Sequence, residues 1–145
     1  PVVADAGFQA RVIMGEFHGG GSPVRLDHET LYVDLRLAPG GRVPIPPSVE
    51  ERAIYVLDGA IEIAGDRFDA DRLLVLRPTD EIVVTSPESA HIVLLGGAPL
   101  GSKRHIWWNF VSSSKERIEQ AKEEWKSRRF AVVPGDEDEF IPLPG

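Results

Sequence analysis

Apolar residues occupy every second position from Leu31 to Leu37, and polar or aromatic side chains fill the positions between them. A period of two predicts a β-strand with one buried face. Shorter apolar runs recur up to Gly97, separated by turn signals about every 8–12 residues, a spacing typical of an antiparallel sandwich or barrel. The further strands predicted in this way are Phe8–Phe17, Ala53–Leu57, Ala60–Ile63, Leu73–Leu76, Ile82–Val84 and Ile92–Leu95.

One turn in this series carries a specific signal. Asp58-Gly59 separates Ala53–Leu57 from Ala60–Ile63, and glycine accepts the positive φ that a type I′ hairpin turn demands. We therefore predict a hairpin in which these two strands pair with each other.

The hydrophobic pattern changes after Phe110. Ser113 and Glu116 have the spacing of a capping box, in which the serine caps the first helical turn and the glutamate reaches back. Apolar side chains then recur at helical spacing, at Ile118, Ala121 and Trp125. These signals predict one amphipathic helix at about residues 114–128, followed by an extended acidic tail at residues 134–145.

Composition indicates a single domain over residues 1–145. Hydrophobic residues make up 42% and charged residues 27% of the chain, close to the average of soluble proteins. The net charge of −7 argues against direct binding to nucleic acid, and no apolar run is long enough to cross a membrane. The chain has no cysteine, which excludes disulfides and thiolate metal ligands and fits a cytoplasmic location.

The segment Gly40 to Gly59 resembles the first motif of the cupin superfamily, in which two histidines and a glutamate converge on a metal. Counting back from Gly59, the glutamate position falls on Arg52, and the histidine positions fall on Pro46 and Ser48. A guanidinium stays protonated and repels a cation. Arg52 is therefore a candidate for binding an anionic ligand, or it pairs with a nearby carboxylate.

The second cupin motif contributes one more histidine after a turn, and Pro87 to Ala90 stands in the place of that turn. Strict spacing puts the ligand position on Ile92, and a slip of one residue would bring His91 inward instead. We retain His91 and Tyr55, together with Arg52, as candidate ligand-binding residues. No catalytic residue, metal ligand or cofactor is predicted within this chain.

Aromatic residues gather at Trp107, Trp108 and Phe110, just before the predicted helix. Such a cluster either pins the entry of the helix against the body of the fold or forms an interface with a partner. We predict these three residues as candidate interface residues.

Several motifs in a fixed order resemble the C-terminal domain of pirins, most clearly Tyr55–Gly59, Gly96–Gly101, His105–Val111 and Glu116–Ala121. The resemblance implies a mostly β, cupin-type antiparallel barrel or jelly roll (a double-stranded β-helix) with one C-terminal α-helix. Pirins are bicupins, so it also implies an N-terminal cupin domain with iron and, in some members, quercetin 2,3-dioxygenase activity. None of the family's metal ligands can be placed on this sequence.

Three functions follow as hypotheses. The first is a metal-free structural and interaction module, whose partner is the N-terminal cupin domain of the same protein or a second copy of the chain. The second is a small-molecule-binding cupin that uses Arg52. The third is a quercetin dioxygenase-like oxygenase, which rests on family association alone, and we do not expect enzymatic activity from this chain by itself.

Overall fold

The computed structural model describes residues 1–144, and the contacts divide the chain into two compact units, Pro1–Pro99 and a second unit that begins at Leu100. Gly145, the last residue of the predicted acidic tail, lies outside the described residues. Each unit is described by itself, and the single domain predicted for residues 1–145 stays a prediction.

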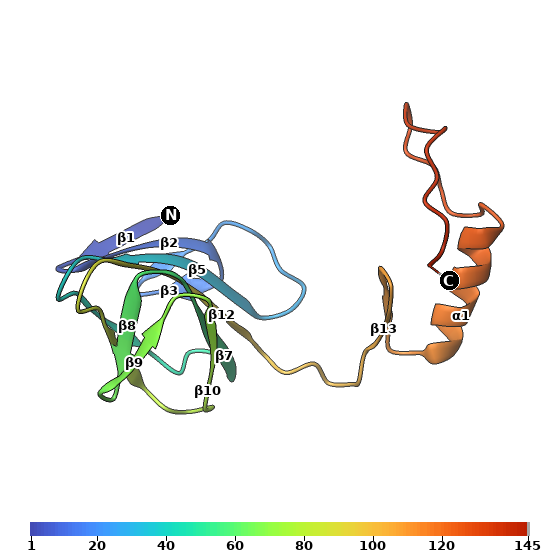
Figure 1. Cartoon of the computed structure of the whole chain (residues 1–145). Helices are drawn as coiled ribbons and strands as arrows, with labels where there is room; N and C mark the ends of the chain where they lie inside the picture. The colour runs from blue at the N-terminus through green and yellow to red at the C-terminus, as the bar shows by residue number, and fades with distance from the viewer. Residues whose placement is uncertain (145) are drawn as a thin grey trace. The chain divides into compact units, whose positions relative to one another are not determined.

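The first unit consists of strands (Figure 1). They are β1 (Val2–Asp5), β2 (Phe8–Met14), β3 (Glu16–Phe17), β4 (Gly20–Gly21), β5 (Thr30–Leu37), β6 (Arg42–Ile45), β7 (Glu51–Asp58), β8 (Ala60–Ile63), β9 (Asp66–Asp69), β10 (Arg72–Leu76), β11 (Ile82–Thr85) and β12 (Ala90–Gly97). A six-stranded sheet has the order β1-β2-β5-β12-β7-β10, and a four-stranded sheet has the order β6-β11-β8-β9. The two sheets do not join into one closed barrel, but their antiparallel pairing agrees with the predicted jelly roll.

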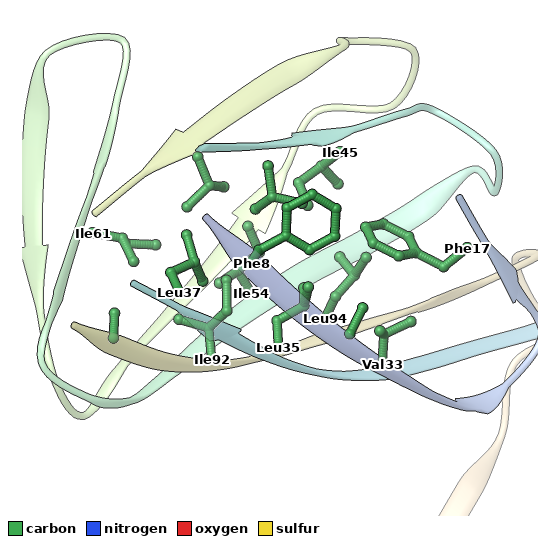
Figure 2. Packing of buried hydrophobic residues seen from close by; sticks show 14 of the residues in the cluster. Phe8, Phe17, Val33, Leu35, Leu37, Ile45, Ile54, Ile61, Ile92 and Leu94 are labelled. Carbon is green, nitrogen blue, oxygen red and sulfur yellow. The ribbon is translucent and has the colours of Figure 1, made fainter. Parts of the chain in front are cut away.

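The alternating strand behaves as the sequence predicts. Leu31, Val33, Leu35 and Leu37 of β5 are each at most 3% exposed, and they join one apolar core with inward side chains from both sheets. Figure 2 shows Phe8 and Leu35 packed among Ile54, Ile92 and Leu94 in this core. Burial of one face per strand is therefore what holds the two sheets together.

The predicted Asp58-Gly59 hairpin is wrong. Strands β7 and β8 lie in different sheets and do not pair, so Gly59 carries the chain from one sheet to the other. Its φ is +72°, and a Cβ atom there would come within 2.2 Å of the carbonyl oxygen of Ser89. A two-residue hairpin forms instead at Ala64-Gly65, where both φ angles are positive and β8 pairs with β9.

The first predicted strand is also interrupted. Residues 8–17 divide into β2 and β3, because Gly15 between them takes a φ of +79° that strand geometry does not allow. The β1 strand at Val2–Asp5, which the hydrophobic pattern did not predict, pairs with β2.

The second unit contains a short hairpin, β13 (His105–Trp107) and β14 (Phe110–Ser112), and the helix α1 (Lys115–Lys126). The N-cap is Ser114 rather than the predicted Ser113, and its hydroxyl oxygen accepts a hydrogen bond from the Arg117 backbone N–H at 3.1 Å. Glu116 accepts a hydrogen bond from this same hydroxyl at 2.7 Å, whereas the Ser114 backbone N–H donates to Oγ of Ser112. The predicted capping box therefore does not form. Among residues 1–144, no helix combines the length and apolar character needed to cross a membrane.

Candidate functional site

Arg52 lies on β7 with its side chain on the inner face of the sheet. Along this strand, Arg52, Ile54 and Val56 are buried at alternate positions, and Arg52 itself is 2% exposed. The period of the strand therefore forces the arginine into the interior, as expected of a residue at a cupin ligand position.

The guanidinium of Arg52 is held by main-chain carbonyl groups. Nη1 donates to the oxygens of Ile45 at 3.2 Å and Pro46 at 3.1 Å, and Nη2 donates to those of Arg77 at 3.0 Å and Asp80 at 2.7 Å. Ile45 is the last residue of β6, and Pro46 follows it in the connection to β7. Arg77 and Asp80 both lie in the connection between β10 and β11. The side chain thus ties together two connections that are distant in sequence.

These contacts define what Arg52 can do chemically. A guanidinium has five N–H donors, and four are already engaged, while Nε has no partner among residues 1–144. No carboxylate of residues 1–144 forms an ion pair with this side chain, so the predicted alternative of such a pair does not describe it. The geometry favours a structural clamp, since an incoming anion would find one N–H rather than a fork.

The other cupin ligand positions do not fit a metal either. Pro46 and Ser48 offer no imidazole or carboxylate, and Ile92 is completely buried on the inner face of β12. Transition metals and zinc in such sites require histidine nitrogens and carboxylate oxygens. Within the described range, no cluster of three or more such residues is placed to hold a metal ion. The residues at these four positions therefore do not suit a transition metal such as the iron that the resemblance places in the N-terminal cupin domain.

His91 points to the outer face of the sheet, because its neighbours Ala90 and Ile92 are the buried residues of β12. The strict spacing that placed Ile92 inward agrees with the structure. The Nε2 of His91 lies 2.6 Å from Oδ2 of Asp34 on the neighbouring strand β5. Sequence alone did not reveal this pair, since its members are separated along the chain and meet only through strand pairing.

Tyr55 also lies on the outer face, one position from the buried Ile54. Its hydroxyl donates to Oδ1 of Asp71 at 3.2 Å, and this hydrogen bond, assisted by the negative charge of Asp71, raises the pKa of Tyr55. Arg52 faces the core, so the structure does not bring the three candidate residues into one site. A cavity of about 330 Å³ in this unit is lined by Gly15, His28 and Val49 among others, and by none of the three.

Two other histidines hold loops. His18 and His28 each lie 2.8 Å from a main-chain carbonyl oxygen, those of Pro44 and Ala98 respectively. These contacts explain both residues as structural.

The three predicted interface residues form one cluster with the helix. The ring of Trp108 meets that of Trp125 edge-to-face at 5.3 Å, and Phe110 stacks on Phe130 at 5.7 Å. Lys122 of α1 lies 4.6 Å above the ring of Trp107. The cluster therefore joins the β13–β14 hairpin, the helix and the segment that follows it, while its role as an interface stays a prediction.

Comparisons with known proteins agree with this architecture. Residues 32–131 match the family model described as the pirin C-terminal cupin domain. A pirin-like protein of Caulobacter vibrioides is 41% identical over 99% of this chain and 50% of its own length, and human pirin is 31% identical over 83% and 44%. A crystal structure of quercetin 2,3-dioxygenase from Acinetobacter baumannii superimposes with a TM-score of 0.86 at 29% identity, covering 100% of this chain and 50% of the other.

The chain spans about half the length of the curated relatives it matches. Together with the two-sheet jelly roll and the order of its motifs, the match over most of the chain shows that this chain belongs to the pirin family, as a pirin C-terminal cupin domain.

Proposed function

We propose that this chain is the structural half of a pirin-like protein, which packs beside a metal-bearing cupin half and contributes no metal ligand of its own. The observation that carries the proposal is Arg52. A permanently protonated side chain fills a metal-ligand position, and it is fixed there by four main-chain carbonyl groups.

The length of the relatives supports a partner within the same polypeptide. The Caulobacter relative continues for another half beyond the part that matches this chain. Quercetin 2,3-dioxygenase is the name given to a structural relative, and in our proposal any such activity belongs to that other half. The present chain would then stabilise the other half and shape the space around its metal.

A fusion protein tests the proposal. The non-matching half of the Caulobacter relative is placed before Pro1, and metal content is measured by mass spectrometry for the fusion and for the chain alone. We expect a stoichiometric transition metal only in the fusion, together with one cooperative unfolding transition. A stoichiometric transition metal in the chain alone, or two independent unfolding transitions in the fusion, would overturn the proposal.

The same two proteins separate the enzymatic possibilities. Quercetin consumption under aerobic conditions is expected only from the fusion, because the cupin ligand positions described above carry no histidine or carboxylate that would hold a catalytic metal. Activity of the metal-loaded chain alone would assign the chemistry to this half and contradict the proposed division of roles.

A further inference from the structure

The cavity of about 330 Å³ in the first unit is separate from the three candidate residues discussed above. Its walls are formed by residues 15–16, by the segment of residues 26–31 and by residues 48–49. Small-molecule sites in proteins have volumes from about 300 Å³ upwards, so this cavity is large enough for a small ligand. None of the contacts described so far gives it a role.

The loop that forms one wall of the cavity is held at both ends. Residues 22–29 connect β4 to β5. At the start of this loop, the backbone N–H of Ser22 donates to the carbonyl oxygen of Gly15 at 2.9 Å. At its end, the backbone N–H of Ala98 donates to the carbonyl oxygen of Glu29 at 3.2 Å. The wall is therefore preformed, which lowers the entropic cost of binding a ligand.

Part of the cavity lining is apolar. Leu31 is 2% exposed and belongs to the core of the unit, and Val49 is partly buried and packs against the same core. Leu26 adds a third apolar side chain from the loop and is 38% exposed. These three side chains can cover the apolar body of a ligand and remove it from water.

The charged groups of the lining all have the same sign. Glu16, Asp27 and Glu29 line the cavity, and no lysine or arginine does. Among residues 1–144, none of these three carboxylates forms an ion pair with a basic side chain. An incoming cation therefore meets negative charge that no other group of the described chain compensates.

The neutral polar groups of the lining have largely used their donors. Nε2 of His28 lies 2.8 Å from the carbonyl oxygen of Ala98, which can only accept. Nε2 therefore carries the proton, and Nδ1 of the neutral ring is left as an acceptor. The hydroxyl of Thr30 donates to the carbonyl oxygen of His28 at 3.1 Å. Ser48 is the only lining side chain that keeps a free donor, so the cavity calls for a ligand that donates hydrogen bonds.

We propose that this cavity binds a small organic cation, in which a primary amine, amidine or guanidine is attached to an apolar body. The cation supplies both the positive charge and the several N–H donors that the lining lacks. A bare metal ion does not fit, because no three acidic or histidine side chains of residues 1–144 are placed to hold one. The inference goes beyond the proposed function and does not depend on it, since every lining residue belongs to the first unit.

A titration with three matched compounds tests the proposal. Phenethylamine, phenethyl alcohol and hydrocinnamate share a phenyl ring on a short chain and differ in charge, which is positive, neutral and negative respectively. Each is added to the full isotope-labelled chain, and backbone amide shifts are followed by NMR. We expect saturable shifts at residues 15–16, 26–31 and 48–49, with the amine binding at least about fivefold more tightly than the alcohol. Added salt should weaken the binding of the amine.

Variants that neutralise single carboxylates assign the binding to this cavity. Glu16→Gln combined with Glu29→Gln should weaken phenethylamine by about fivefold or more, because two charged acceptors are lost. Asp27→Asn removes the third carboxylate and gives an independent measurement in the same direction. Asp66→Asn is the matched control, since Asp66 is exposed on β9 and does not line the cavity, and its effect should stay below about twofold. All four positions are exposed, and urea unfolding checks that each variant is folded.

Three other outcomes would each overturn the inference. Equal binding of the amine and the alcohol would mean that the cavity is an apolar hollow without selection for charge. An equal loss in Asp66→Asn and in the cavity variants would mean that the amine is attracted by the net charge of the chain and not by this site. Tighter binding of hydrocinnamate, or no saturable shifts at the lining residues with any of the three compounds, would exclude a cation site here. None of these results bears on the metal content of the fusion, so the proposed function is tested separately.

Discussion

The clamp formed by Arg52 makes a prediction whose size can be worked out from its contacts. Arg52→Met keeps a side chain of similar length and removes every donor. The carbonyl oxygen of Ile45 is fully buried at this contact, whereas the bonds to Pro46, Arg77 and Asp80 are partly exposed. A buried acceptor that loses its partner costs roughly 1–3 kcal/mol, and partly exposed acceptors cost less because water replaces the donor.

The change in the free energy of unfolding of Arg52→Met also includes a stabilising contribution. Removing a buried cation relieves a desolvation penalty, which offsets part of the lost hydrogen bonding. We expect the free energy of unfolding of the first unit to fall by about 3 kcal/mol in Arg52→Met. Arg52→Lys retains the charge but not the planar fork, so we expect a loss of about 1–2 kcal/mol.

The assay must report on the first unit. All three tryptophans, Trp107, Trp108 and Trp125, belong to the second unit, so urea unfolding is followed by far-ultraviolet circular dichroism rather than by fluorescence. Arg36→Met is the matched control, since Arg36 is exposed on the outer face of β5, and its effect should stay within about 0.5 kcal/mol. Unchanged stability in Arg52→Met would refute the clamp. A loss that vanishes in high salt would also refute it, because neutral buried acceptors are not screened.

Three further predictions concern other parts of the chain. Gly59→Ala should lower the stability of the first unit by roughly 3 kcal/mol or more in urea unfolding, because the added Cβ meets a carbonyl group at a positive φ; wild-type stability would contradict this turn geometry. Ser114→Ala should weaken the helix by about 1 kcal/mol. The Ser114 hydroxyl is also the main reason that the pKa of Glu116 is lowered from 4.5, so a carboxyl titration by NMR should show this pKa rising in the same variant. Because the pKa of Glu116 is lower in the folded than in the unfolded state, its ionised carboxylate stabilises the folded state above the unfolded pKa. This stabilisation is lost as the pH falls through the folded pKa. Trp125→Phe removes the donor to the carbonyl oxygen of Ile141 at 2.8 Å, and faster proteolysis of the tail is expected, with an unchanged rate counting against this anchor.

The sequence predicted the elements whose signals are local. The period of two in β5 and the apolar spacing of α1 depend only on neighbouring residues, and both were confirmed. The N-cap was misplaced because Ser112, Ser113 and Ser114 offer the same hydroxyl group, and only the backbone geometry selects one. The turn at Gly59 was recognised, but a positive φ does not say which sheet receives the next strand.

The strand position of Arg52 was predictable, but its contacts and the separation of Tyr55 and His91 from it were not. Counting from Gly59 placed Arg52 at the glutamate position of the motif, and in the structure this side chain is buried. Its acceptors at Arg77 and Asp80 could not be foreseen, because main-chain carbonyl groups carry no residue-specific signal. The pairing of His91 with Asp34 depends on the register between β12 and β5, which is a non-local property of the sheet.

The position of β12 has a consequence for how the first unit folds. This strand is the last of the unit in sequence, yet it lies in the middle of the six-stranded sheet, between β5 and β7. Until it is inserted, β5 and β7 both present unpaired edges and the sheet remains two separate pieces. Non-local pairing of this kind slows folding, and exposed edges promote aggregation while it is incomplete. Synthesis up to β11 therefore cannot yield a finished sheet, and release of Ala90–Gly97 is the step that allows the two pieces to close.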